Sequence, residues 1–277
     1  ILLSNFIANP FEPVSSDIVV QNGNGLNPLL QNYWMVIHPP TLFLGFALCI
    51  LPFSYAVSSL RLRDYRKWLN PTQKYLLLSV VVLGIGIMMG AYWAYETLNF
   101  GGYWNWDPVE NAVYVPWLFL VASFHCLILT NRKKQYYRMS YVLSLSSFLL
   151  ILYSTFLTRS GILGDSSVHS FTDLGLSGQL LICLFLFIMI SIYLLVTRWS
   201  DIPNTAKESN AYSGDFWLFI GILTLILMSF QVILPTSIPV YNAIIEFFGG
   251  FSNLAPPAEK EIFYSNAQIW FASSIAV

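Results

Sequence analysis

The chain has few charged residues. Only 10% of its 277 residues are Asp, Glu, Lys or Arg, whereas 56% are hydrophobic and 17% are aromatic. This composition excludes a soluble domain, because so few charged side chains cannot make a polar surface. The net charge of -1 and the lack of a long basic run argue against nucleic acid as a partner. We therefore expect a multi-span membrane protein with the lipid bilayer as its surroundings.

Cysteine is also scarce, and its placement excludes two kinds of chemistry. Cys49, Cys126 and Cys183 lie in apolar stretches and show no Cys-x-x-Cys spacing, so neither a disulfide framework nor a thiol redox pair is indicated. Without a Cys-x-x-Cys-His run, the chain cannot attach haem covalently to itself.

Six apolar segments have about the 20 residues that a helix needs to cross the hydrocarbon core. A seventh apolar run opens near Ala267 and is cut at Val277, and the chain begins with Ile1 rather than Met, so we expect an internal piece of a longer protein. We predict an all-α polytopic transmembrane helical bundle, a single membrane domain over 1–277 with a truncated seventh span. The six full spans are expected at 41–60, 75–95, 113–130, 139–158, 176–197 and 216–234.

The cations predict the orientation of the bundle. Eleven of the thirteen Lys and Arg residues fall in the loops 61–74, 131–138 and 198–215, which are therefore the expected inside loops. The alternate loops hold only Arg159 and Lys260. The expected outer segments are 1–40, 96–112, 159–175 and 235–266.

The outer loop 96–112 is unusually rich in aromatic residues. Trp104 and Trp106 are two apart and would face the same way in an extended segment, with Tyr103 beside them. Aromatic faces this dense at the edge of the bilayer form a flat apolar surface larger than anchoring needs, which indicates a planar ligand. We interpret the flanking aromatic residues as the interfacial belt of the adjoining helices: Tyr92, Trp93, Tyr95, Tyr114 and Trp117.

Asp107 and Glu110 look like a catalytic pair, but their spacing has a structural explanation. In Asp-Pro-x-Glu, Asp107 is the expected N-cap, Pro108 the first helical residue and Glu110 the third, a capping box that opens the third span. The positive end of that helix then faces the outer loop, where ligand carboxylates would be received. Arg159, at the end of the fourth span, is either an interfacial anchor or the partner of such a carboxylate.

The chain has only three histidines. His38 precedes Pro39 and is therefore expected outside the α conformation, at the outer mouth of the first span. His169 lies in the outer loop 159–175. Each of these two is either an interfacial histidine or, because both flank the aromatic loop, an axial ligand of an iron porphyrin. His125 falls inside the third span, where it needs a backbone carbonyl, a serine or a metal as its partner.

The run Trp104-Asn-Trp-Asp-Pro-Val-Glu-Asn-Ala112 resembles the tryptophan-rich "WWD" signature of the haem-handling proteins of cytochrome c maturation, and its ending resembles the CcmF branch more than the CcmC or CcsA branches. His38-Pro-Pro and Ser167-Val-His169 resemble the external haem histidines of the family, and His125 the first ligand of a buried haem. The second buried ligand would lie beyond Val277. The resemblance implies that these residues contact haem at the outer site: His38, Tyr103, Trp104, Trp106, Asp107, Glu110, Asn111, Arg159 and His169.

The resemblance implies cytochrome c biogenesis. A CcmF-like haem lyase component would take haem from a haem chaperone, hold it transiently at the outer loop and present it to the thiols of an apocytochrome c, with other maturation membrane subunits as partners. A second, buried b-type haem would transfer electrons. No catalytic residue of its own is needed, since the substrate brings the thiols, and the piece alone is expected to be inactive. The bacterial inner membrane is the expected location, with the mitochondrial inner membrane as the alternative and the tryptophan-rich loop on the periplasmic side.

Two alternatives have different consequences. A haem exporter or secondary transporter would use Asp107 and Glu110 as a coupling site, although both acids lie at the membrane edge rather than at its midplane. A non-catalytic haem-binding assembly scaffold would bind haem without promoting its attachment.

Overall fold

The structure is a computed structural model that describes residues 25–98, 101–164, 175–203 and 213–275, together with Pro13, Asn22 and Ser167. Its described residues form helices and no strands. Internal contacts divide the chain into Ile1–Gln31 and Asn32–Val277. The first unit contains the short 3-10 helix η1, Pro28–Leu30. The second contains the long helices, and the prediction of one domain over 1–277 stays a prediction.

All six predicted spans are helices of membrane-crossing length, which confirms the all-α polytopic bundle. The chain is therefore an integral multi-pass membrane protein. The spans are α2 with α3 (Tyr33–Leu48 and Ile50–Leu62), α4 (Leu69–Thr97), α5 (Pro108–Lys133), α6 (Tyr137–Arg159), α7 (Ser177–Arg198) and α8 (Gly214–Thr236).

The first span begins earlier than predicted and includes His38, Pro39 and Pro40. His38 lies inside α2 rather than ahead of it, because the helix continues through Pro39 and Pro40. The preference of a pre-proline residue for extended backbone is a local one, and a helix that packs along α4 overrides it. The span is interrupted instead at Cys49, where Pro52 lacks the N–H that would bond to the carbonyl of Leu48.

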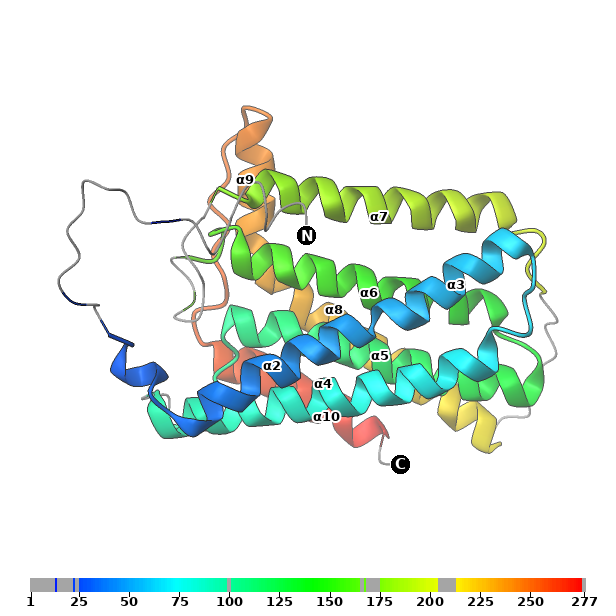
Figure 1. Ribbon diagram of the computed structural model, residues 1–277, viewed down its shortest axis with the longest axis horizontal. Helices are drawn as coiled ribbons and strands as arrows, with labels where there is room; N and C mark the ends of the chain where they lie inside the picture. Colours follow the sequence, from blue (N-terminus) through cyan, green and yellow to red (C-terminus); the bar gives the residue numbers. More distant parts are fainter. Residues whose placement is uncertain are drawn as a thin grey trace. The chain divides into compact units, whose positions relative to one another are not determined.

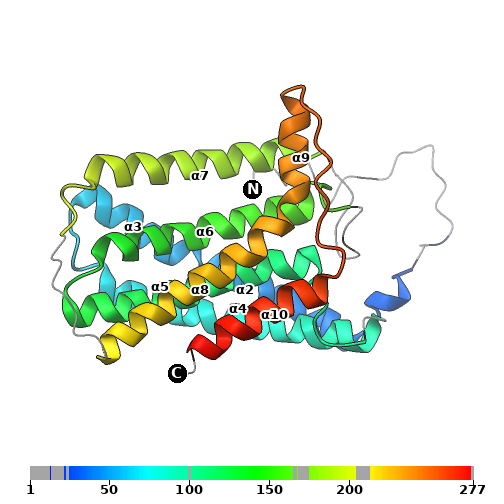
Figure 2. The same ribbon diagram turned by 180° about the vertical axis from the view of Figure 1, so that it is seen from behind.

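The six spans, of which α2 with α3 is the first, run antiparallel in turn, so that alternate connections share one end of the bundle (Figure 1). Helix α5 is central and packs against α4, α6 and α8, whereas α2 packs along α4 (Figure 2). The start of α2, residues 101–107, the end of α6 and the end of α8 consequently lie together at what we call the outer end. Which side of a membrane this end faces stays a prediction.

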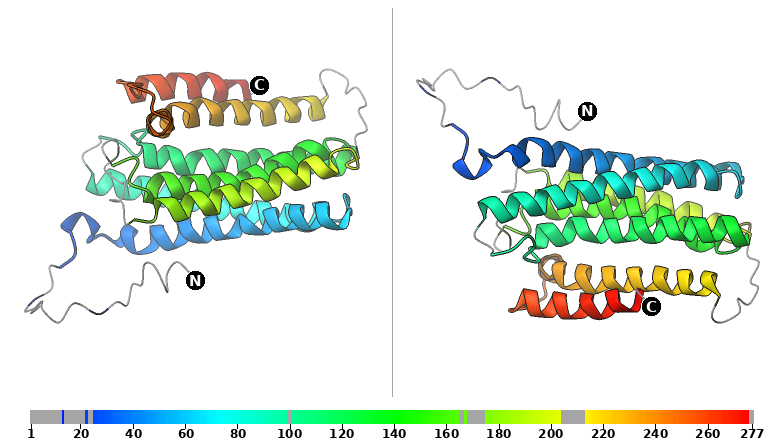
Figure 3. Two further views of the ribbon diagram at one scale, coloured as in Figure 1. Left: turned by 90° about the horizontal axis from the view of Figure 1, so that it is seen from above. Right: turned by 90° about the horizontal axis from the view of Figure 1, so that it is seen from below.

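Two further helices follow α8. Helix α9, Ile238–Phe247, runs across the direction of the bundle, and α10, Lys260–Ile275, turns back along α8 (Figure 3). Helix α10 corresponds to the predicted seventh span but begins seven residues before Ala267. It therefore brings polar and aromatic residues of the 260–268 region to the outer end.

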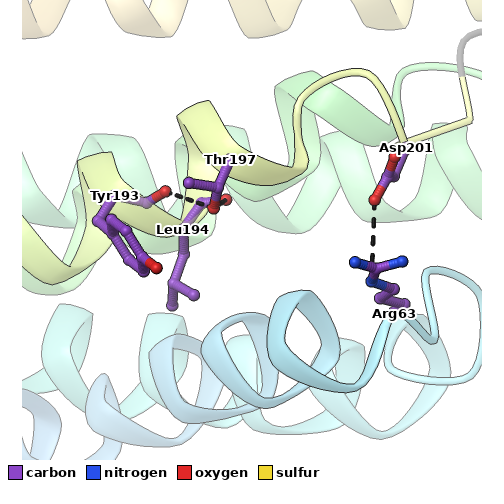
Figure 4. A network of polar contacts seen from close by, with 5 residues as sticks. All are labelled: Arg63, Tyr193, Leu194, Thr197 and Asp201. Carbon is purple, nitrogen blue, oxygen red and sulfur yellow. Dashed lines mark hydrogen bonds and ion pairs between the residues drawn. The ribbon is translucent and has the colours of Figure 1, made fainter.

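The opposite end carries the cation-rich connections. There the exposed Arg63 Nε lies 3.9 Å from Asp201 Oδ2, which joins the end of α3 to the turn after α7 (Figure 4). In the last turn of α7, Thr197 Oγ1 donates to the carbonyl of Tyr193 at 2.7 Å. An exposed ion pair of this kind contributes little stability, so the bundle depends on its apolar packing.

Candidate functional site

The tryptophan-rich loop ends in the predicted capping box. Asp107 Oδ2 accepts a hydrogen bond from Val109 N at 3.0 Å, and Glu110 Oε2 accepts from Asp107 N at 3.1 Å. Pro108 is the first residue of α5. Glu110 Oε2 also accepts from Asn105 N at 3.0 Å. Both carboxylates therefore hold the backbone at the point where the loop becomes helix, as the sequence predicted.

Asp107 has a second role that the sequence did not predict. Its Oδ2 also accepts a hydrogen bond of 2.6 Å from Ser167 Oγ, and both residues are buried. This bond joins the start of α5 to the loop that follows α6. The predicted ligand His169 lies outside the described residues. Ser167 is two residues before it in the sequence, so the bond fixes the position of Ser167 in the same loop.

Trp104 and Trp106 do not form one flat surface, so this prediction was wrong. Trp106 has a φ of 52°, which is left-handed rather than extended backbone. The two rings consequently meet edge to face, at 5.9 Å and 87°. Together they form a corner.

Helix α10 holds Trp106 in place. The indole stacks on Tyr264 at 5.3 Å and 25°, and its Nε1 donates to Ser265 Oγ at 2.8 Å. Gln268 Oε1 accepts from the hydroxyl of Tyr114 at 3.2 Å. Sequence analysis missed these three α10 residues because no motif or local spacing connects them to the loop.

Trp104 instead lines an apolar hollow of about 400 Å³. Its Nε1 is buried and has no hydrogen-bond partner among the residues that the structure describes. An orphaned buried donor is costly, and it suits a ligand that brings an acceptor. The other walls are Trp106, Tyr114 and Trp117 with one face of α4, namely Gly84, Ile87, Met88 and Ala91.

Tyr114 and Trp117 are therefore more than belt residues. Tyr114 meets Trp104 edge to face at 5.8 Å and stacks on Trp117 at 6.2 Å. Trp117 Nε1 donates to the carbonyl of Val80 on α4 at 3.0 Å, which fixes that ring against the neighbouring helix. The aromatic surface that the sequence placed in the loop thus continues over the first turns of α5, as far as Trp117.

His38 lies next to this hollow. Its Nδ1 is 2.8 Å from the carbonyl oxygen of Gly86 on α4, and that contact requires the proton on Nδ1. Nε2 then carries the lone pair. A Cβ at Gly90 would lie only 2.5 Å from His38 Cε1, so glycine is needed there for the imidazole to pack against α4. The half-buried ring is thus held in one tautomer by backbone, an arrangement common for metal-binding histidines.

A smaller hollow of about 80 Å³ lies between His38 and Trp104, with Glu110 also in its wall. Ile87, Ala91 and Trp104 line both this hollow and the larger aromatic one. The two hollows are therefore neighbours along α4 with these three residues as shared walls, and His38 lines the smaller of the two.

Two other predicted loop residues lie away from the hollows. Tyr103 stacks on Tyr95 of α4 at 4.2 Å and 15°, and half of its surface is exposed. Asn111 is buried and donates to Trp106 O at 3.2 Å and Thr236 Oγ1 at 3.1 Å, which joins α5 to the end of α8. Neither residue lines the two hollows beside Trp104, although Asn111 lines a small cavity next to Trp106, and their predicted contact with haem stays a prediction.

The two outer cations, Arg159 and Lys260, and the histidine of the third span, His125, lie outside the two hollows. Arg159 ends α6 and lines neither hollow, whereas Lys260, at the start of α10, lines a small cavity together with Trp106.

His125 in α5 has its Nδ1 2.8 Å from the carbonyl oxygen of Val121 in the same helix, so in the neutral ring the lone pair is on Nε2. This carbonyl bond is one of the alternatives that the sequence left open.

Comparisons with known proteins place these features in context. Residues 2–163 match the family model described as Cytochrome C assembly protein. The cytochrome c-type biogenesis protein CcmF of Pseudomonas fluorescens is 31% identical over 261 residues, which are 92% of this chain and 38% of the relative. CcmF of Haemophilus influenzae is 34% identical over 245 residues, 87% of this chain and 37% of that protein.

One solved structure, described as Cytochrome c Heme Lyase CcmF, is similar with a TM-score of 0.69 and 25% identity. The likeness covers 99% of this chain and 37% of that one. The chain thus spans less than two fifths of the length of the relatives it matches.

Proposed function

The chain belongs to the cytochrome c assembly protein family and is CcmF-like. We propose that it holds haem at the two hollows beside Trp104 and presents the haem for covalent attachment to an apocytochrome c. Haem is here the substrate, received from a haem chaperone and passed on with other maturation membrane subunits as partners. The tryptophan-rich loop would face the periplasm of a bacterial cell, or the corresponding side of the mitochondrial inner membrane.

The observation that carries the proposal is His38 and Trp104 lining one hollow. The Nδ1 of the imidazole is bound to Gly86 O, so Nε2 of the neutral ring is the nitrogen that would bind iron. Trp104 provides an apolar face and a buried N–H that has no hydrogen-bond partner among the described residues. The adjoining aromatic hollow of about 400 Å³ falls in the size range of small-molecule sites and suits a flat apolar ring system. These residues fit haem.

The reaction needs little from the protein beyond orientation. Each thiol of the apocytochrome adds across a vinyl group, so that one C–S bond forms and the thiol hydrogen goes to the neighbouring carbon. All atoms come from the two substrates. This chain would contribute a fixed histidine, an apolar wall and exclusion of water, and holding two reactants in register can supply a large part of the rate. No residue here is assigned as a nucleophile.

Three further assignments belong to this proposal. His169 would be the second axial ligand at the outer site, and His125, with its own Nδ1 bound to Val121 O, would ligate a buried b-type haem. Arg159, for which the sequence left an interfacial anchor and a carboxylate partner as alternatives, is one candidate to pair with a propionate. Lys260 is a better-placed second candidate, because it shares a cavity with Trp106.

The transporter alternative is less well supported. Asp107 and Glu110 accept hydrogen bonds from the backbone N–H groups that open α5, and Asp107 also accepts from Ser167. Carboxylates bound in this way favour a fixed charged form and a fixed position, whereas a coupling site must change its protonation or ion occupancy during transport. The yield of matured cytochrome c distinguishes a lyase component from a scaffold, because a scaffold would bind haem without promoting its attachment.

The test uses the full-length protein. His38→Gly should reduce haem retained at the outer site and the yield of matured cytochrome c, and added imidazole should restore part of both by entering the space that the side chain leaves. Unchanged protein level is the control. Normal haem content and normal cytochrome yield in His38→Gly would contradict the ligand assignment, while normal haem with no cytochrome would favour a different role for the histidine.

A further inference from the structure

A long apolar groove lies on the membrane-embedded surface, away from the proposed haem site. It has a volume of about 720 Å³, and it is floored by α6 and walled by α7 and α8. The α6 residues along it run from Arg138 to Tyr153, a rise of about 22 Å at 1.5 Å per residue. That exceeds one leaflet, which is about half of the 30 Å hydrocarbon core. Almost every other side chain lining the groove is aliphatic or aromatic.

One end of the groove is marked by a single cation. Arg138 Nη2 donates to the carbonyl of Trp199 at 2.9 Å, and its guanidinium carbon lies 4.8 Å from the centre of the Trp199 ring. These contacts fix the guanidinium at the mouth of the groove. Its Nε is buried without a hydrogen-bond partner, and no carboxylate among the described residues forms an ion pair with it. Among the described residues, the site therefore has a donor without a hydrogen-bond partner and a cation without an ion-pair partner.

The start of α6 adds to this positive field. The helix begins at Tyr137 after Tyr136, which gives no side-chain cap, so the first N–H groups of α6 have no capping side chain. A helix N-terminus favours an anion, and Arg138 in the first turn adds a full charge at the same place. An apolar channel that runs toward the bilayer centre from an anion-binding mouth has the two recognition elements of a phospholipid.

We propose that this groove binds one anionic phospholipid, with its phosphate on Arg138 and the start of α6, and one acyl chain along α6 between α7 and α8. The phosphate accepts hydrogen bonds from the Arg138 guanidinium, and the acyl chain covers apolar side chains that no other described helix covers. The site would belong to the leaflet on the side of the 131–138 loop, opposite the tryptophan-rich loop.

The experiment measures lipid binding to the full-length protein by native mass spectrometry, with palmitoyl-oleoyl phosphatidylglycerol as the probe. R138Q should weaken binding by at least about tenfold, since a charge-assisted contact to phosphate is lost. Arg132→Gln removes an exposed cation one turn and a short connection away and should leave binding unchanged. Palmitoyl-oleoyl glycerol, which has the same chains and no phosphate, should bind wild type and R138Q alike.

A second variant tests the groove itself. Ser146→Phe places a ring in the middle of the groove and should reduce phosphatidylglycerol binding while Arg138 stays intact. Val196→Phe, on a lipid-exposed face of α7, is the matched control. Equal binding by R138Q and wild type, or by Ser146→Phe and wild type, would overturn the proposal. Wild-type protein that retains no phospholipid would also overturn it, and would point to a further transmembrane helix in the groove.

Discussion

At the scale of single residues, the two tryptophans of the loop have different tasks. Trp106 has its N–H bound to Ser265 and its ring stacked on Tyr264, so its binding capacity is used inside the protein. Trp104 has a buried N–H without a partner among the described residues and lines both hollows. The sequence shows two equivalent tryptophans, and only the packing against α10 distinguishes them.

This difference is testable with the same substitution at both positions. Trp104→Phe keeps an aromatic face and breaks no hydrogen bond among the described residues, so we expect less loss of stability than at Trp106, and about tenfold weaker haem binding because the donor and part of the ring are removed. Trp106→Phe should cost about 1 kcal/mol of stability through the lost bond to Ser265. Haem titration and thermal unfolding of the full-length protein measure the two effects. If the two variants respond identically in both measurements, the division of tasks is wrong.

At the scale of the helix and its cap, local chemistry is well predicted from sequence and long-range pairing is not. Asp-Pro-x-Glu predicts the start of α5 because a capping box depends on four consecutive residues. His38 was misplaced because the pre-proline rule is equally local, whereas packing against α4 through Gly86 and Gly90 decides the outcome. The Ser167 to Asp107 bond spans 60 residues, and no sequence signal points to it.

The capping box and the Ser167 bond can be separated by mutation. Asp107→Asn should be nearly silent, because Asn is an equally good N-cap and its Oδ1 can accept from both Val109 N and Ser167 Oγ. Asp107→Ala should cost about 1 kcal/mol of local stability. Ser167→Ala keeps the cap but releases the loop that carries His169, so outer haem occupancy should fall more than stability does.

Haem occupancy and thermal unfolding of the full-length protein are again the measurements, with expression level as the control. The informative contrary result is normal occupancy in Ser167→Ala combined with a loss in Asp107→Asn. It would mean that the carboxylate contacts haem or its donor directly, rather than through the loop.

At the scale of the whole molecule, the antiparallel bundle brings the candidate residues to one end. Hydropathy and length predict the six spans, and the alternation of spans places the 96–112 loop and the end of α6 together. They do not predict which helices touch. The hollow depends on α4 as a floor and on α10 as a support, and these neighbours follow from three-dimensional packing around α5.

The most direct test of the central claim fills the aromatic hollow without removing any proposed ligand. Ala91 lines both hollows on α4, and Val81 lies on an exposed face of the same helix. The measurement is the reduced absorbance spectrum of the purified full-length protein, expressed as outer-site haem per chain. We predict that Ala91→Phe loses the outer-site haem while Val81→Phe retains it. Wild-type haem content in a folded Ala91→Phe protein would contradict the account.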